Sequence, residues 1–219
     1  VVGHEKRPGA DILTQAFIIG IRSTGCRVVD LGVSLTPIVY FITAHGTYDG
    51  GVNITGSHNV YFYNGFKLMK KDVWPLFSQE LQVMRMLIEK EDFIKAEKPA
   101  VLETLDAFSV YSEYLLSHIK LARPLTIVMD CGNGSAGVFA PELFKKLGCE
   151  VIGLYIDSDA TFPHHIPDPE QRQFYGELQR LVVNKKADLG IAFDADGDRV
   201  GFVDERGEFI EADEALLIF

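Results

Sequence analysis

Residues 125–156 of the chain read LTIVMDCGNGSAGVFAPELFKKLGCEVIGLYI. The apolar run 125–129 predicts a buried strand, and residues 132–137 form a glycine-rich turn that leads into a predicted helix over 138–147. Gly148 stops that helix, and residues 151–156 predict a second strand. A strand, a helix and a strand in this order indicate a layered α/β architecture.

The same alternation extends in both directions from this stretch. The chain opens on strand-like sequence, and further strands are expected over 27–31, 52–54 and 189–193, with helices over 10–23, 76–90, 110–119 and 171–184. Residues 200–203 are expected to pair with 208–210 across a turn at Arg206 and Gly207. A turn is expected at 49–51. The charged, irregular stretch 92–105 predicts a boundary between a domain over 1–105 and a domain over 106–219.

A short internal repeat suggests that the two domains are related. Residues 24–28 (TGCRV) and 147–151 (LGCEV) each close a helix and open a strand. One crossover later, each is followed by a strand that runs into a polar loop, over 52–59 and over 191–199. Ligands of open α/β sheets bind at such strand ends, so each domain is expected to supply one functional loop.

Composition and charge narrow the class of protein. The chain of 219 residues carries 21 Lys and Arg against 31 Asp and Glu, a net charge of −10, which argues against nucleic acid or an anionic membrane as the main partner. Cys26, Cys131 and Cys149 predict reduced thiols, and no apolar run approaches the roughly 20 residues of a membrane span. We therefore expect a cytoplasmic protein. The strand-like start and the helix start over 211–219 further suggest a piece of a longer chain.

The motif DADGDR at 194–199 carries the clearest chemical signal. Asp194, Asp196 and Asp198 follow a predicted buried strand at alternate positions, and three such carboxylates ionise together only when a cation neutralises them. All-oxygen ligands favour Mg²⁺ or Ca²⁺. An EF-hand is excluded because Arg199 stands where that loop requires glycine.

A second motif, TGSHN at 55–59, also follows a predicted strand. Gly56 beside Ser57 and His58 is typical of a reactive hydroxyl in a tight loop, although a plain polar turn is an equally good interpretation. The P-loop pattern is not met, because its Lys is missing after Gly56. Lys67, in the following NGFK segment, is placed to fold back on Ser57.

The glycine pattern GNGSAG at 132–137 allows two interpretations. It matches G-x-G-x-x-G, and Asp157 stands at a suitable distance for a ribose-binding carboxylate, so a dinucleotide-binding oxidoreductase is one alternative. A tight strand-to-helix turn that needs glycines for packing is the other. The proline-bound segment 162–169, with His164 and His165, is interpreted as shaping a cleft rather than as a metal site.

Taken together and in this order, the serine motif, NGFK, DCGNG at 130–134 and DADGDR resemble the α-D-phosphohexomutases, that is, the phosphoglucomutase and phosphomannomutase enzymes. The resemblance spans nearly the whole chain and is greatest to the bacterial phosphomannomutase/phosphoglucomutase branch. It implies two three-layer α/β domains with mixed sheets from a four-domain family, the first domain being truncated at its N-terminus.

The resemblance also implies an activity. The family comprises isomerases that interconvert hexose 1-phosphate and hexose 6-phosphate through a phosphoserine and a bisphosphate intermediate, with hexose 1,6-bisphosphate as activator. Ser57 would carry the phosphoryl group. Asp194, Asp196 and Asp198, with a phosphate oxygen on Ser57, would hold Mg²⁺. His58, Lys67 and Arg199 would assist proton transfer and phosphate contact.

This sequence departs from the family pattern in three places. Val60 replaces the usual proline after Ser-His-Asn, and of the basic segment near the start of the first domain only Arg7 is retained. The later two domains, which carry sugar and phosphate recognition, have no counterpart in these 219 residues. We therefore expect this chain by itself to turn over little substrate, and the choice of hexose phosphate is left open.

Overall fold

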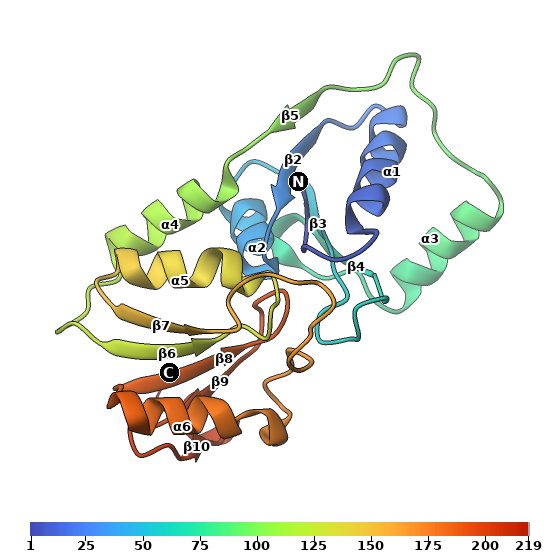
Figure 1. Ribbon diagram of the computed structural model, residues 1–219. Helices are drawn as coiled ribbons and strands as arrows, with labels where there is room; N and C mark the ends of the chain where they lie inside the picture. Colours follow the sequence, from blue (N-terminus) through green and yellow to red (C-terminus); the bar gives the residue numbers. More distant parts are fainter. Residues whose placement is uncertain (219) are drawn as a thin grey trace. The chain divides into compact units, whose positions relative to one another are not determined.

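The computed structural model describes residues 1–218, which divide into two compact units (Figure 1). The first unit contains residues 1–55 and 64–107, and the second contains residues 56–63 and the chain from Phe108 onward. The short segment Gly56–Tyr63 thus lies within the first unit in sequence but packs with the second. This segment carries the serine motif.

The first unit is built on a five-stranded sheet in the order β4-β3-β1-β2-β5. Its strands are β1 (Val2–His4), β2 (Val28–Val33), β3 (Gly50–Ile54), β4 (Phe66–Lys70) and β5 (Leu102–Thr104). All neighbours are parallel except β3 and β4, which are antiparallel. The helices are α1 (Ala10–Ser23), α2 (Thr36–His45) and α3 (Gln79–Glu89), with a 3-10 turn, η1 (Lys71–Val73).

The second unit contains a five-stranded sheet in the order β10-β9-β8-β6-β7. Its strands are β6 (Thr126–Asp130), β7 (Glu150–Leu154), β8 (Leu189–Phe193), β9 (Val200–Val203) and β10 (Phe209–Ile210). β7, β6 and β8 are parallel, whereas β9 and β10 are antiparallel to their neighbours. The helices are α4 (Ala107–His118), α5 (Ala136–Lys146), α6 (Gly176–Lys185) and α7 (Ala212–Leu216), with a 3-10 turn, η2 (Arg172–Phe174).

The two units repeat one topology. The series β1-α1-β2-α2-β3-β4 has its counterpart in β6-α5-β7-α6-β8-β9, with the same strand neighbours. The repeated sequences at 24–28 and 147–151 run into the first residues of the equivalent strands β2 and β7. Residues 55–65 and 194–199 are the equivalent connections from β3 to β4 and from β8 to β9. The prediction of two related α/β domains with mixed sheets is confirmed.

Neighbouring side chains of β6 pack into two different parts of the hydrophobic core of the second unit. Met129 packs with Ala136 and Ala140 of α5, whereas its neighbour Val128 packs with Leu178 and Val182 of α6. Successive side chains of a strand point to opposite faces, so α5 and α6 cover opposite faces of this sheet, as Figure 1 shows. β6 and β8 are interior strands of this sheet, and both strands end at polar loops.

Two glycines decide how closely α2 packs on the first sheet. A Cβ at Gly3 would lie 2.8 Å from Val39 Cγ2, and one at Gly51 would overlap the hydroxyl of Thr43. Both Gly50 and Gly51 belong to β3, so the predicted turn at 49–51 is wrong at these two positions. The close backbone approach of helix and strand explains why glycine occupies a strand here.

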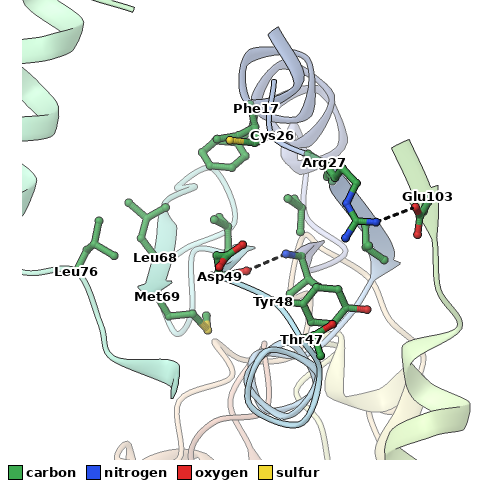
Figure 2. A pocket seen from close by; sticks show the side chains of 18 of the residues that line it. Phe17, Cys26, Arg27, Thr47, Tyr48, Asp49, Leu68, Met69, Leu76 and Glu103 are labelled. Atoms are coloured by element: carbon green, nitrogen blue, oxygen red, sulfur yellow. Dashed lines mark hydrogen bonds and ion pairs between the residues drawn. The ribbon is translucent and has the colours of Figure 1, made fainter. Parts of the chain in front are cut away.

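The opposite face of the first sheet, under α1, has a hollow of about 440 Å³ (Figure 2). Its apolar lining includes Phe17, Leu68 and Leu76, and Arg27 and Glu103 form an exposed ion pair at its edge. None of the residues of α3 is buried, although its apolar positions recur at helical spacing. The predicted helix over 76–90 is confirmed in a shorter form.

Most predicted elements occur within two or three residues of their expected bounds, and the helix over 10–23 matches α1. The prediction that 92–105 is irregular throughout is wrong, because Leu102–Thr104 form β5 and pair with β2. The predicted helix over 171–184 begins as the 3-10 turn η2. Within the expected helix start at 211–219, α7 forms, and Phe219 lies outside the described residues. The domain boundary after residue 105 stays a prediction.

No helix among residues 1–218 combines the length and the apolar character that a membrane crossing requires.

Candidate active site

The acidic motif forms a tight turn between β8 and β9. The carboxylate oxygen Oδ1 of Asp194 accepts hydrogen bonds from the backbone N–H groups of Asp198, at 3.0 Å, and Arg199, at 3.1 Å. Gly197 has a φ of 71°, a left-handed conformation that glycine adopts without strain. The first carboxylate thus organises the loop that carries the other two.

The three carboxylates converge as the spacing predicts. Ligand oxygens of Asp194, Asp196 and Asp198 all lie within 4.8 Å of one another, and the first two side chains are fully buried. Burial, together with the charges of Asp196 and Asp198, raises the pKa of Asp194 to about 7. Buried like charges of this kind repel unless a cation lies between them, and an all-oxygen set fits Mg²⁺.

Ser57 lies directly beside this acidic cluster. Its hydroxyl donates a hydrogen bond to Oδ2 of Asp194, with Oγ and Oδ2 3.2 Å apart. Ser57 has a φ of 51°, a strained value for a side-chain-bearing residue. Asn59 secures the turn, because its backbone and side-chain N–H groups both donate to the carbonyl of Gly56.

Arg199 completes the group around the serine. Its Nη2 donates to Ser57 Oγ at 3.3 Å, and its Nε donates to Oδ2 of Asp194 at 3.2 Å. On the other side, Nη1 donates to Glu170 at 3.0 Å and lies 3.5 Å from Asp168. Ser57, Asp194 and Arg199 therefore meet at one point, with a hydroxyl, a carboxylate and a guanidinium in mutual contact.

The other two predicted residues are placed differently. His58 is exposed, and its Nδ1 lies 3.5 Å from Ser57 Oγ. Lys67 lies on β4 of the first unit, opposite Asn53 of β3. The roles of both residues stay predictions.

The sequence patterns did not identify Asp168 and Glu170 as partners of Arg199. Asp168 belongs to the proline-bound segment 162–169, which was expected only to shape a cleft, and Glu170 directly follows that segment. Their alternation around Pro169 is the one signal that could have drawn attention to them.

The glycine turn between β6 and α5 is explained by packing. A Cβ at Gly134 would lie 2.6 Å from Cα of Ala195, and one at Gly137 would overlap the carbonyl oxygen of Ile156. The N–H of Ala136 donates to the carbonyl of Ala195 at 3.3 Å. The start of α5 therefore supports the acidic loop, and this geometry favours the packing interpretation over a dinucleotide site.

The fold and these motifs are matched by known proteins. Residues 1–95 match the family described as "Phosphoglucomutase/phosphomannomutase, alpha/beta/alpha domain I", and residues 109–207 match domain II of the same family. The chain belongs to the phosphoglucomutase/phosphomannomutase family, of which it contains domains I and II.

Individual relatives agree with this assignment. The chain is 40% identical over 218 residues to a phosphomannomutase/phosphoglucomutase of Pseudomonas aeruginosa and 36% identical over 218 residues to a phosphoglucomutase of Neisseria gonorrhoeae. All of this chain is covered in both cases, but only 46% and 47% of the relatives. A phosphoglucomutase/phosphomannomutase family protein of Burkholderia thailandensis superposes with a TM-score of 0.95 at 35% identity, covering 100% of this chain and 49% of that one. The chain thus spans about half the length of its relatives.

Proposed function

We propose that this chain is the catalytic half of a phosphohexomutase, an isomerase that interconverts hexose 1-phosphate and hexose 6-phosphate, with Ser57 as the phosphoryl carrier. The observation that carries the proposal is the contact of Ser57 Oγ with both Asp194 and Arg199. A hydroxyl between an acidic cluster and a guanidinium is placed to accept a phosphoryl group and to release it again.

The proposed reaction consists of two phosphoryl transfers. In the first, the bond between phosphorus and Ser57 Oγ breaks, and a bond forms from phosphorus to the free hydroxyl oxygen of a hexose monophosphate. The proton of that hydroxyl passes to Ser57 Oγ, and the product is a hexose 1,6-bisphosphate. In the second, the other phosphoryl group of the reoriented bisphosphate returns to Ser57 Oγ, and the sugar oxygen that it leaves takes up the proton.

The acidic loop is proposed to hold Mg²⁺ through Asp194, Asp196 and Asp198, together with a phosphate oxygen on Ser57. Bound there, Mg²⁺ would neutralise negative charge on the transferred phosphoryl group. The support for this assignment is the convergence of the three carboxylates and the burial of two of them.

Arg199 would supply a fixed positive charge to the equatorial oxygens of the transferred group, since Nη2 already contacts Ser57 Oγ. His58, with Nδ1 3.5 Å from the same oxygen, would contact the phosphate or relay its proton. Lys67 is proposed for the same tasks from the family resemblance alone. Hexose 1,6-bisphosphate would act as the activator that first loads Ser57.

The proposal covers the substrate class only. The relatives include enzymes named for both mannose and glucose phosphates, and we keep glucose, mannose and glucosamine phosphates as alternatives. We expect the 219-residue chain alone to turn over little, and we place the full-length enzyme in the cytoplasm.

The test compares Ser57→Ala with wild type in the full-length protein, using glucose 1-phosphate and mannose 1-phosphate with Mg²⁺ and a trace of glucose 1,6-bisphosphate. The variant is expected to lose activity by at least about a thousandfold, as for removal of a nucleophilic serine. Ser117→Ala, which removes an exposed hydroxyl on α4, is the matched control and should leave activity unchanged. Equal activity of Ser57→Ala and wild type would refute the role of Ser57.

A further inference from the structure

The segment between Phe162 and Gln171 is anchored to the end of β6 by a histidine. His165 places Nε2 3.1 Å from Oδ2 and 3.2 Å from Oδ1 of Asp130, whose carboxylate is almost fully buried. Its Nδ1 lies 2.9 Å from the carbonyl oxygen of Ile166. Both partners are acceptors, so both ring nitrogens donate and the imidazole carries a positive charge. His165 and Asp130 therefore form a mostly buried ion pair.

The ring of His165 is also held by its packing. It stacks on Phe174, with centroids 5.0 Å apart and planes 18° apart, and meets Tyr155 edge-on at 5.6 Å. The preceding His164 stacks on the other ring, that of Tyr155, and its Nδ1 lies 2.7 Å from Oδ1 of Asn133. The two histidines thus fix one point of the segment on the glycine turn.

The path from this anchor to Arg199 is short and stiff. Asp168 follows His165 by three residues, between Pro167 and Pro169, whose rings fix the backbone φ angle. The carbonyl of Pro169 accepts a buried hydrogen bond of 2.8 Å from the hydroxyl of Tyr175. Asp130, His165 and Asp168 line one cavity of about 10 Å³. Displacing the histidine would therefore displace Asp168.

Asp168 and Glu170 are the two carboxylates that hold the outer side of Arg199, on Nη1. The inner side of the guanidinium contacts Asp194 and Ser57. A guanidinium that carboxylates bind on both sides keeps one orientation. A guanidinium bound only by Asp194 is free to rotate toward that carboxylate. Asp168 and Glu170 therefore determine how closely the guanidinium of Arg199 lies against Ser57 Oγ.

We propose that His165 is a positioning residue, whose ion pair with Asp130 fixes the 162–171 segment so that Asp168 and Glu170 hold Arg199 against Ser57. This inference rests on the proposed function of Ser57. It assigns a role to a residue that touches neither the serine nor the acidic cluster. Loss of the pair would slow phosphoryl transfer while leaving the carboxylates that bind metal in place.

The main test uses His165→Phe in the full-length protein, since phenylalanine retains stacking on Phe174 and loses both donors. The rate at which Ser57 takes up a phosphoryl group from glucose 1,6-bisphosphate should fall about 10–100-fold, the usual effect of removing an outer support. The KM for the hexose phosphate should change less than kcat. His165→Gln, which can donate one hydrogen bond to Asp130, should recover part of the rate and serves if the first variant does not fold.

A matched control is available in the same unit. His118 on α4 is exposed and stacks on Tyr114 at 4.1 Å, without a carboxylate partner among the interactions of its ring in the described residues. His118→Phe should leave the rate of phosphoryl uptake unchanged. A similar loss in both histidine variants would mean that general loosening explains the effect, and the positioning role would be rejected.

A double-mutant cycle tests the path itself. If His165 acts through the segment, His165→Phe should have little further effect in an Asp168→Asn/Glu170→Gln background, because both outer partners of Arg199 are already weakened. Additive losses would overturn the proposal. In parallel, the Nε–H nuclear magnetic resonance signal of Arg199, identified by its loss in Arg199→Lys, should shift and exchange faster in His165→Phe. An unchanged signal contradicts the proposal whether or not the protein is a mutase.

The outcomes separate the two proposals. A wild type that never phosphorylates Ser57 refutes the proposed function, and the Arg199 signal then still decides whether His165 positions the guanidinium. A wild type that is phosphorylated alongside a His165→Phe variant of equal rate refutes only the positioning role.

Discussion

The hydroxyl of Ser57 donates a hydrogen bond to the carboxylate of Asp194 over 3.2 Å, although 137 positions separate the two residues in the chain. Each follows an equivalent strand, β3 or β8, in the repeated topology. In this repeat, one connection carries the proposed nucleophile, and its counterpart carries the carboxylates that are proposed to bind metal.

Removal of one buried charge should separate metal binding from stability. In Asp196→Asn, the affinity for Mg²⁺, measured by titration calorimetry, should fall at least about tenfold, because even outer partners of metal ligands are worth about 10–100-fold. Without metal, the variant should be more stable than wild type by about 1 kcal/mol, since a like charge beside Asp194 is removed. Asp213→Asn, an exposed change on α7, should alter neither quantity. Unchanged Mg²⁺ affinity in Asp196→Asn would refute the metal site.

Arg199→Lys should slow phosphoryl transfer, although it retains the positive charge. A lysine cannot contact Ser57, Asp194 and Glu170 at once, and loss of one donor to a reacting group typically costs about 100-fold in rate. Arg206→Lys is the control, because that arginine makes a similar two-atom contact with Asp204 at the hairpin turn. Single-turnover measurement of Ser57 phosphorylation distinguishes the two, and equal rates in Arg199→Lys and wild type would contradict the role of the fork.

The glycine turn should be intolerant of a methyl group. Gly134→Ala is expected to destabilise the protein by about 1–3 kcal/mol in urea unfolding, since the new Cβ would meet Cα of Ala195. Gly176→Ala at the start of α6 meets nothing within 4 Å and should be neutral or slightly stabilising. If wild type bound a nicotinamide dinucleotide at micromolar affinity and Gly134→Ala did not, the packing interpretation would be wrong.

The His165–Asp130 pair should stabilise the fold at acidic rather than alkaline pH. Burial alone would lower the pKa of His165, but the hydrogen bond and charge of Asp130, helped by Ile166 and Glu177, outweigh it and raise the pKa. A raised folded-state pKa contributes stability below the unfolded value of about 6.5, and the contribution is lost as pH rises through the folded value.

Other ionisable groups around His165 are Asp168 and Tyr175, which line the same cavity, and Tyr155, which contacts its ring and donates to Glu177. The difference in unfolding free energy between wild type and His165→Gln should therefore be larger at pH 5.5 than at pH 9. His118→Gln, an exposed change on α4, is the control for the substitution itself. A difference that grows with pH would reverse the assigned sign.

The sequence was sufficient where local pattern and burial agree. Residues 189–199 combine an apolar run with regularly spaced acids, and both β8 and the acidic turn form as predicted. The helix α1 has one buried face and a clear period, so its bounds match. Such segments need no knowledge of the rest of the chain.

Other elements depend on partners that are distant in sequence. The helix α2 is apolar almost all round, so it shows no helical period and was not predicted. The edge strand β5 has exposed residues and forms because β2 offers it hydrogen bonds. Likewise, β4 mixes Phe66 and Leu68 with two lysines, and its pairing with β3 decides its conformation.

The candidate site follows the same division. Ser57 and the three aspartates were predicted as candidate site residues from their motifs, and the structure places Ser57 Oγ 3.2 Å from Oδ2 of Asp194. The contacts of Asp168 and Glu170 with Arg199 could not be predicted, because they depend on the path of a loop that His165 anchors.

Peptide mapping decides whether Ser57 is the phosphoryl carrier beside a metal-binding acidic loop. The full-length protein is incubated with glucose 1,6-bisphosphate and Mg²⁺, and the peptide containing residues 55–59 is analysed by mass spectrometry. We expect one added phosphoryl group on Ser57, removed again by excess hexose monophosphate, and little or none in Asp196→Asn. An unmodified Ser57 in wild type, or a phosphoryl group on another residue, would contradict it.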